Sequence, residues 1–158
     1  MRKFMAAVAL FGIACGGGES AGDAATEEMD HSEMSAEEHA TMGGTGTVHE
    51  VQMVLTEDGN YRYVPDALTI KVGDTVRWIN VSGGPHNVAF YADSIPGGAA
   101  DFLGEAMPDQ MMPLSGGFMT APNATYDITF VGAPTGEYGY VCTPHEPMGM
   151  VAKLTVEE

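Results

Sequence analysis

Basic residues are scarce in this 158-residue chain, which has 6 Lys and Arg against 22 Asp and Glu. The formal net charge is -16 with His neutral. This shortage excludes sequence-independent binding to nucleic acid, because contacts to phosphate need a basic surface. It also disfavours electrostatic docking on anionic lipid. Since 44% of the residues are hydrophobic, the chain can still bury a core, and its length suits one domain of ordinary size.

Cysteine is also rare, with two residues in the chain. Cys15 follows a basic start and a run without charge from 4 to 14, which is typical of an export signal and too short for a stable membrane-spanning helix. Residues 1–14 are therefore predicted to be a signal peptide of the lipoprotein type, with Cys15 lipidated as the new N-terminus. Such signals usually carry Leu where this chain has Gly12, so ordinary cleavage near Ala14 is the alternative.

Large apolar residues are missing from the next segment, which has no Val, Ile, Leu or aromatic residue between 16 and 46 and neither Lys nor Arg. Eight acidic residues lie in it. Because nothing there can form a core, residues 15–46 are predicted to be a flexible acidic tether. The tether also contains Met29, His31, Met34, His39 and Met42. These residues are incidental, or they form a weak copper-scavenging arm, since thioether and imidazole groups suit copper.

The remaining chain has strand patterns and no convincing helical period. Apolar and other residues alternate along Val51–Leu55, Leu68–Val72, Tyr126–Phe130 and Met150–Val156. Residues 47–158 are therefore predicted to form one all-β domain, an antiparallel sandwich of about seven to eight strands. The stretch 93–123 is rich in Gly, Pro and Met, and is predicted to be a connection or a short irregular helix.

Several residues that resemble site residues are predicted to be structural instead. His49 begins a strand far from the other histidines of the domain. The large aromatic residues are more typical of core than of an electron relay: Trp78, Phe90 and Phe130. The methionines of the long connection are predicted to fill gaps or to form a soft docking surface. They are Met107, Met111, Met112 and Met119.

Four side chains with soft or imidazole ligand atoms lie near predicted strand ends: His86, Cys142, His145 and Met150. Alternate side chains of a strand share a face. His86, Cys142 and Met150 are each in phase with apolar neighbours, so each falls on the apolar face at the end of a strand. His145 lies in the turn between Cys142 and Met150. We therefore expect all four to converge at one end of the sandwich.

Two imidazoles, one thiolate and a weak thioether form the ligand set of a blue-copper electron-transfer site. Thiolate and thioether favour Cu(I), and imidazole accepts Cu(II). If Cys15 is lipidated, Cys142 is the one thiol left, which is unusual in an exported protein. Metal binding would explain an unpaired cysteine there, because a metal both uses and protects the thiolate. Met150 is preferred as the thioether ligand, because Met148 falls earlier in the turn and is predicted to pack around the site. Asn87 is predicted to hydrogen-bond near the sulfur, and Pro144 to stiffen the turn.

The chain resembles the plastocyanin-like blue copper proteins of the cupredoxin family over residues 48–158. Four stretches carry the resemblance: Pro85-His86-Asn87, C-T-P-H-E-P-M-G-M from Cys142 to Met150, the tail M-V-A-K-L-T-V from Met150 to Val156, and L-T-I-K-V-G-D-T-V-R-W-I-N from Leu68 to Asn80. The resemblance implies a cupredoxin-like Greek-key β-sandwich and one type 1 copper ion. It further implies three equatorial ligands and one axial ligand. The equatorial ligands are His86, Cys142 and His145, and the axial ligand is Met150.

The resemblance also implies one-electron transfer between larger redox proteins, for example with a membrane electron-transfer complex. The acidic domain favours a basic partner such as a cytochrome c. No enzymatic activity is expected, because the predicted ligand set leaves no obvious open coordination position for a substrate. Plastocyanins generally have Tyr where this chain has Val141, which leaves their acidic partner surface in doubt. The tether brings the chain nearer to membrane-tethered relatives such as auracyanin and halocyanin. We expect an exported, lipid-anchored monomer on the periplasmic or extracytoplasmic membrane face. The alternative is an exported copper-delivery protein that uses the Met and His residues of its tether.

Overall fold

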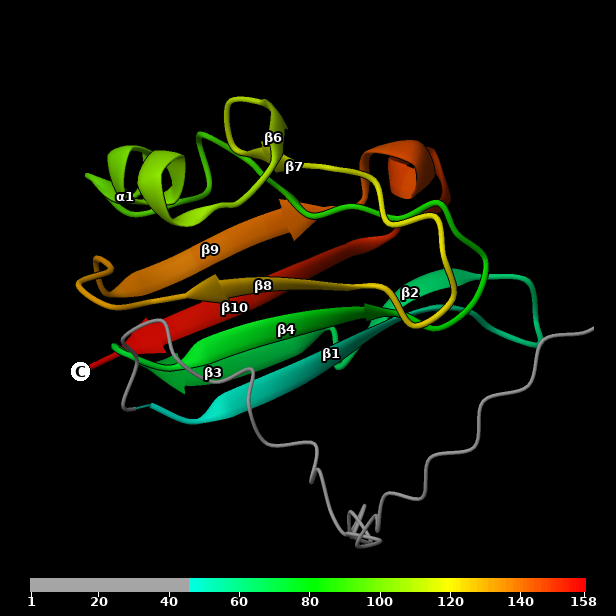
Figure 1. The fold of residues 1–158 in the computed structure, drawn as a ribbon, viewed down its shortest axis with the longest axis horizontal. Coiled ribbons are helices and arrows are strands. Elements are labelled where there is room, and N and C mark those ends of the chain that lie inside the picture. The colour runs from blue at the N-terminus through cyan, green and yellow to red at the C-terminus, as the bar shows by residue number, and fades with distance from the viewer. Residues whose placement is uncertain (1–45) are drawn as a thin grey trace, which may run out of the picture. The chain divides into compact units, whose positions relative to one another are not determined.

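A computed structural model describes residues 46–158 as two β-sheets that pack face to face (Figure 1). The predicted signal peptide, Cys15 and the predicted tether up to residue 45 lie outside the described residues. In the described part, the predicted all-β sandwich is confirmed. No helix of residues 46–158 is long and apolar enough to cross a membrane.

One sheet has four strands and the other has six. The four-stranded sheet has the order β2 (Tyr61–Val64), β1 (Val48–Leu55), β4 (Thr75–Asn80) and β8 (Thr125–Thr129). The six-stranded sheet has the order β3 (Ala67–Lys71), β10 (Val151–Glu157), β9 (Gly136–Val141), β5 (Ala89–Phe90), β7 (Ser115–Gly116) and β6 (Gln110–Met112). Two helical segments complete the domain, the α-helix α1 (Ala99–Ala106) and the 3-10 helix η1 (Thr143–Met148).

The core lies between the sheets and is filled by the residues that alternate along each strand. In β4, Val76 and Trp78 are buried while their neighbours are partly exposed, and β10 buries Leu154 and Val156 in the same way. A side chain on every second position reaches the same face, so each strand contributes an apolar row to the core. The three large aromatic residues predicted to belong to the core are all buried in it. They are Trp78, Phe90 and Phe130.

Strand pairing differs from the predicted antiparallel sandwich, because the sheets are mixed. β1 pairs in parallel with β4, and β3 pairs in parallel with β10, while the other pairs are antiparallel. After β1 and β2 the chain crosses to the other sheet as β3 and then returns as β4. Such a crossover can connect parallel strands, whereas a hairpin joins only antiparallel ones.

The strand count also exceeds the predicted seven to eight. Ten strands are formed in residues 46–158, because three segments of only two or three residues, β5, β7 and β6, extend the six-stranded sheet beyond β9. β6 and β7 lie within residues 93–123, the stretch that shows no strand pattern in the sequence. That stretch also contains α1, as the prediction of a short helix allowed, and α1 buries Ala99 and Leu103 in the core.

Candidate metal centre

Sheet register brings the predicted ligand segments together at one end of the sandwich. In the six-stranded sheet, Val141 at the end of β9 pairs with Val151 of β10 on one side and Ala89 of β5 on the other. The next residue after β9 is Cys142, and the residue before β10 is Met150. His86 lies three residues before β5. Cys142, Met150 and His86 therefore lie at the same end of these three strands. The turn η1 between β9 and β10 supplies His145.

The predicted alternation before β5 is only half correct. His86 is fully buried, as expected, but Asn87 and the next three residues are buried as well. β5 is an interior strand with β9 and β7 on its two sides, and the Asn87 side chain hydrogen-bonds to β7 and to the start of η1. Burial on both faces therefore hides the period of two expected for a strand with one solvent-exposed face.

Three ligand atoms form a small triangle at this end of the domain. His86 Nδ1 lies 3.6 Å from Cys142 Sγ, His145 Nδ1 lies 3.3 Å from the same sulfur, and the two Nδ1 atoms are 3.2 Å apart. All three side chains are buried. A point equidistant from the three atoms lies about 2 Å from each, which is close to the length of metal–nitrogen and metal–sulfur bonds. The triangle therefore has the size of a metal site.

The His86 tautomer fits this role. Its Nε2 lies 2.9 Å from the carbonyl oxygen of Ser82, and since a carbonyl can only accept, Nε2 carries the proton. In the neutral ring, Nδ1 then has a free lone pair, and it is this atom that faces Cys142 and His145. A hydrogen bond from the far nitrogen is the usual way in which proteins orient a histidine ligand.

Burial sets the charge state of the cluster. Desolvation lowers the pKa of His86, and desolvation together with the nearby His86 lowers the pKa of His145. Both imidazoles are therefore favoured in the neutral form that binds metals. Burial raises the pKa of the Cys142 thiol, although the backbone N–H groups of Asn87 and His145 oppose the rise. A metal that binds the thiolate must release this proton, so metal affinity rises with pH.

Backbone hydrogen bonds tie the Cys142–Met150 segment into a compact loop. His145 N donates to Cys142 O at 3.0 Å, Met150 N donates to His145 O at 3.2 Å, and Cys142 N donates to Met150 O at 3.1 Å. Met150 is fully buried, whereas Met148 is 50% exposed at the end of η1. Of the two methionines, Met150 is thus the one whose thioether lies inside the protein.

Asn87 connects the two halves of the site. Its Oδ1 accepts from the backbone N of Thr143 at 2.9 Å and from the Thr143 hydroxyl at 3.1 Å, one residue beyond Cys142. Its Nδ2 donates to Ser115 Oγ at 3.2 Å. Pro144 stands near the start of η1, where its fixed φ suits the helical turn and no backbone donor is lost. Both residues therefore hold the segments that carry the candidate ligands.

Two tyrosines of β2 also contact the site, and no sequence motif pointed to them. The Tyr61 ring stacks on the His145 ring, and the Tyr63 hydroxyl donates to the carbonyl oxygen of Asn87 at 2.7 Å. Their spacing in Tyr61-Arg62-Tyr63 places both side chains on one face of a strand. The spacing could be recognised in the sequence, but the sequence did not indicate that the two tyrosines would contact His145 and Asn87.

The methionines of the long connection divide into two pairs. Met107 and Met119 are buried, in agreement with the gap-filling prediction, and backbone hydrogen bonds in both directions join Met119 to His86. Met111 and Met112 are 58% and 62% exposed on the edge strand β6. The pair on β6 is thus available for contact with another molecule.

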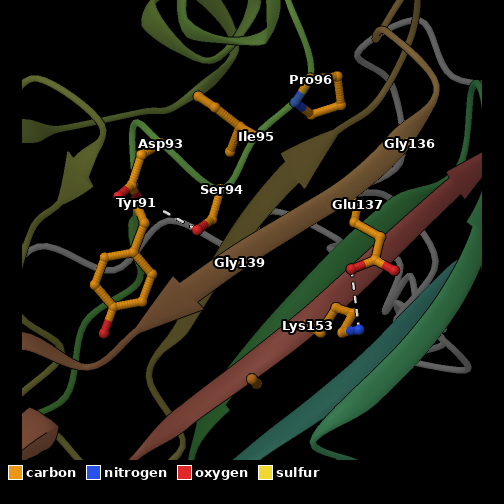
Figure 2. Close-up of a pocket in the computed structure, with 10 residues that line it drawn as sticks. Tyr91, Asp93, Ser94, Ile95, Pro96, Gly136, Glu137, Gly139 and Lys153 are labelled. Carbon is orange, nitrogen blue, oxygen red and sulfur yellow. Dashed lines mark hydrogen bonds and ion pairs between the residues drawn. The ribbon is translucent and has the colours of Figure 1, made fainter.

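A groove in the described part of the chain is separate from the cluster. It is a groove of about 590 Å³ between the segment 91–96 and strands β9 and β10 (Figure 2). Figure 2 shows the ion pair between Glu137 and Lys153, 2.9 Å apart, on one side of it. None of the candidate ligands lines this groove, and the three side chains of the cluster are themselves buried.

Sequence comparisons agree with this geometry. Residues 51–157 match the family described as copper binding proteins, plastocyanin/azurin family. The chloroplastic plastocyanin of Chlamydomonas reinhardtii is 39% identical over 102 residues, which cover 64% of this chain and 62% of the relative. The plastocyanin of a Synechococcus strain is 43% identical over 94 residues, covering 60% of this chain and 62% of the relative. The chain thus matches less than two thirds of the length of either relative.

The fold comparison leads to the same group. The oxidised plastocyanin of Dryopteris crassirhizoma superposes with a TM-score of 0.54 at 27% identity, covering 69% of this chain and all of the plastocyanin. The predicted cupredoxin sandwich and the predicted copper cofactor are therefore confirmed. Members of this group carry electrons and are not enzymes. The chain belongs to the plastocyanin/azurin family of copper-binding proteins.

Proposed function

We propose that this protein carries single electrons between redox proteins at a membrane, with one copper ion held by His86, Cys142, His145 and Met150. The observation that carries the proposal is the buried triangle of two Nδ1 atoms and one Sγ, drawn from segments 56 residues apart in the sequence. When bound there, copper supplies a one-electron couple between Cu(I) and Cu(II). The protein's own contribution is to keep the donor atoms in place while the charge changes.

The residues around the triangle support this role. Asn87 and the three backbone hydrogen bonds of the Cys142–Met150 loop restrain the candidate ligands. A rigid site needs little rearrangement when an electron arrives or leaves, which keeps the barrier to transfer low. The buried Met150 thioether is the candidate for the weak axial ligand, and Met148 is not, because its side chain is half exposed.

His145 gives the shortest route between the site and a partner. It is 6% exposed, whereas His86, Cys142 and Met150 are fully buried. Exposed apolar residues lie on the segments around it, with Met148 in η1 and Phe118 beside the residue paired with His86. Because tunnelling falls steeply with distance, we propose that partners dock over this end of the domain.

Charge determines which partners approach fastest. Residues 45–158 contain 4 basic and 14 acidic residues, a net charge of -10. Such a domain attracts a basic partner surface, as on a cytochrome c, and the attraction weakens as salt screens it. We further propose export and attachment through a lipidated Cys15, which would confine the search for a partner to the membrane plane and raise its effective concentration.

The test begins with the visible spectrum and midpoint potential of the full chain loaded with Cu(II). We expect an intense blue thiolate-to-copper band and reversible one-electron reduction. Stopped-flow mixing with a basic c-type cytochrome should then show a rate that falls as NaCl is added. A colourless protein, or one that gives its copper to a copper-free acceptor and does not exchange electrons, would contradict the proposal. The mass of the mature N-terminal peptide tests lipidation separately.

A further inference from the structure

We propose that Tyr61 is a positioning residue for His145, a role that rests on the proposed copper function. The Tyr61 and His145 rings lie nearly parallel, with centroids 3.8 Å apart and planes 11° from each other. Every other pair of neighbouring rings within residues 46–158 is tilted or edge-to-face. The separation is also below the 4.5–7 Å typical of aromatic pairs. The Tyr61 ring therefore covers one whole face of the imidazole.

The two candidate imidazole ligands are oriented by different means. His86 is held by the hydrogen bond from its Nε2 to the carbonyl oxygen of Ser82, at 2.9 Å. His145 Nε2 makes no hydrogen bond to any residue of the described range 46–158. The hydrogen bonds of its backbone fix the Cα position but leave the ring free to turn about the Cβ–Cγ bond. Stacking on Tyr61 supplies the restraint that a hydrogen bond supplies for His86.

The position of Tyr61 in the stack depends on β2 and on the loop that contains Gly83. Tyr61 pairs with Leu55 of β1, and both side chains lie close to Gly83. A Cβ at Gly83 would lie 2.5 Å from Leu55 Cβ and 3.1 Å from Tyr61 Cε1, and the residue has φ +78°. Glycine at this position leaves the room that Tyr61 needs to reach His145.

β2 therefore supports both halves of the candidate site. Tyr63, on the same face of the strand, donates its hydroxyl to the carbonyl of Asn87, next to His86. Tyr61 acts on the other half through His145. Without the Tyr61 ring, His145 Nδ1 would spend less time directed at Cys142 Sγ, so copper would be held less firmly. The expected change is roughly twofold to tenfold, the range that an aromatic contact contributes.

The experiment compares copper retention in the full-length protein and three variants. Tyr61→Leu removes the ring, Tyr61→Phe keeps it, and Phe102→Leu removes a ring of α1 that neighbours Phe130 and stacks on neither histidine. The reduced, copper-loaded proteins are mixed with the Cu(I) chelator bicinchoninate, and release is followed by absorbance. We expect Tyr61→Leu to release copper roughly twofold to tenfold faster than the natural protein. Tyr61→Phe and Phe102→Leu should match the natural protein.

Two further measurements separate this role from a general effect on folding. Thermal unfolding of the copper-free proteins reports the stability of each variant without the metal. In the reduced natural protein, which is diamagnetic, nuclear Overhauser contacts should join the Tyr61 and His145 ring protons, and their absence would overturn the proposal without any mutation. Equal release rates in all four proteins, or equally fast release from both Tyr61 variants, would also overturn it. Failure of the natural protein to bind copper would instead overturn the proposed function.

Discussion

The domain contains two histidine sites that differ in what surrounds the imidazole. At the start of β1, His49 Nε2 lies 2.8 Å from Asp74 Oδ2, and the same carboxylate accepts from the backbone N of Thr47 and of Lys71. At the other site, His86 and His145 face a buried thiol, and no Asp or Glu of residues 46–158 joins the group. A histidine paired with a carboxylate forms a satisfied structural contact, whereas desolvated neutral imidazoles beside a thiol suit a soft metal.

The two sites also differ in how the protein shifts the pKa values of their side chains. Hydrogen bonds from Lys71, His49 and Thr47 hold the pKa of Asp74 below its ordinary value of 3.8, the backbone of Lys71 contributing most. Burial instead lowers the pKa of His86 and of His145, because no negative group compensates for the lost water. The two sites thus show that a carboxylate partner, rather than burial alone, distinguishes a structural histidine from a candidate ligand in this protein.

The largest effect is expected from removing the thiol. Cys142→Ser should abolish the blue absorption of the copper-loaded protein completely, because a hydroxyl cannot replace the thiolate that produces the band. His49→Gln is the matched change at the other histidine site and should leave the spectrum unchanged. The visible spectra of both variants test the comparison. A blue Cys142→Ser protein would contradict the assignment of the metal centre.

The next effect concerns the two methionines of the loop. Met150→Leu should keep the blue colour but raise the midpoint potential by at least about 60 mV, a tenfold change for a one-electron couple. Loss of a fourth donor destabilises the more highly charged oxidised ion more than the reduced one. Met148→Leu should behave like the natural protein, since its side chain is half exposed. The opposite result in voltammetry would assign the axial position to Met148.

A smaller effect, on stability alone, is expected at the other histidine site. Asp74→Asn should lower the free energy of unfolding by about 1.5–3 kcal/mol, because hydrogen bonds to a charged group are lost. Since folding lowers the pKa of Asp74, its contribution is complete above pH 3.8 and is lost as the pH falls through the lower folded value. Urea unfolding of the copper-free protein at several pH values measures this loss, which should be absent in the variant.

The blue spectrum provides the control for that variant. Copper-loaded Asp74→Asn should absorb like the natural protein at neutral pH, because neither His49 nor Asp74 contributes an atom to the candidate metal centre. A changed spectrum would mean that the two histidine sites are coupled through the sheet, and the comparison between them would fail.

The smallest effect is expected at an ion pair on the surface. Lys153 and Glu137 lie 2.9 Å apart across β10 and β9, but their side chains are 53% and 64% exposed. Water and salt screen such a pair, so Lys153→Met should change the free energy of unfolding by at most about 1 kcal/mol. A larger loss in urea unfolding would mean that the groove of Figure 2 is stabilised by this pair.

Much of the fold was predictable because each strand carries its own apolar period. The rows ending in Cys142 and Met150 were identified from alternation, and both residues are buried where that pattern placed them. Parallel pairing of β1 with β4 was not predictable, because an alternating strand has the same pattern whichever way its neighbour runs. The short strands β6 and β7 were missed for a related reason, since two or three residues are too few to show a period.

Local sequence therefore determined which residues have ligand chemistry and which strand ends they occupy. Cys142, His145 and Met150 lie on one turn and the two strands that it joins, so their proximity could be predicted from the sequence. Only the tertiary structure decided what orients those residues. Tyr61 comes from β2, more than 80 residues before His145, and the carbonyl of Ser82, in the loop after β4, orients His86. Contacts across such separations depend on sheet order and register, which no local pattern encodes.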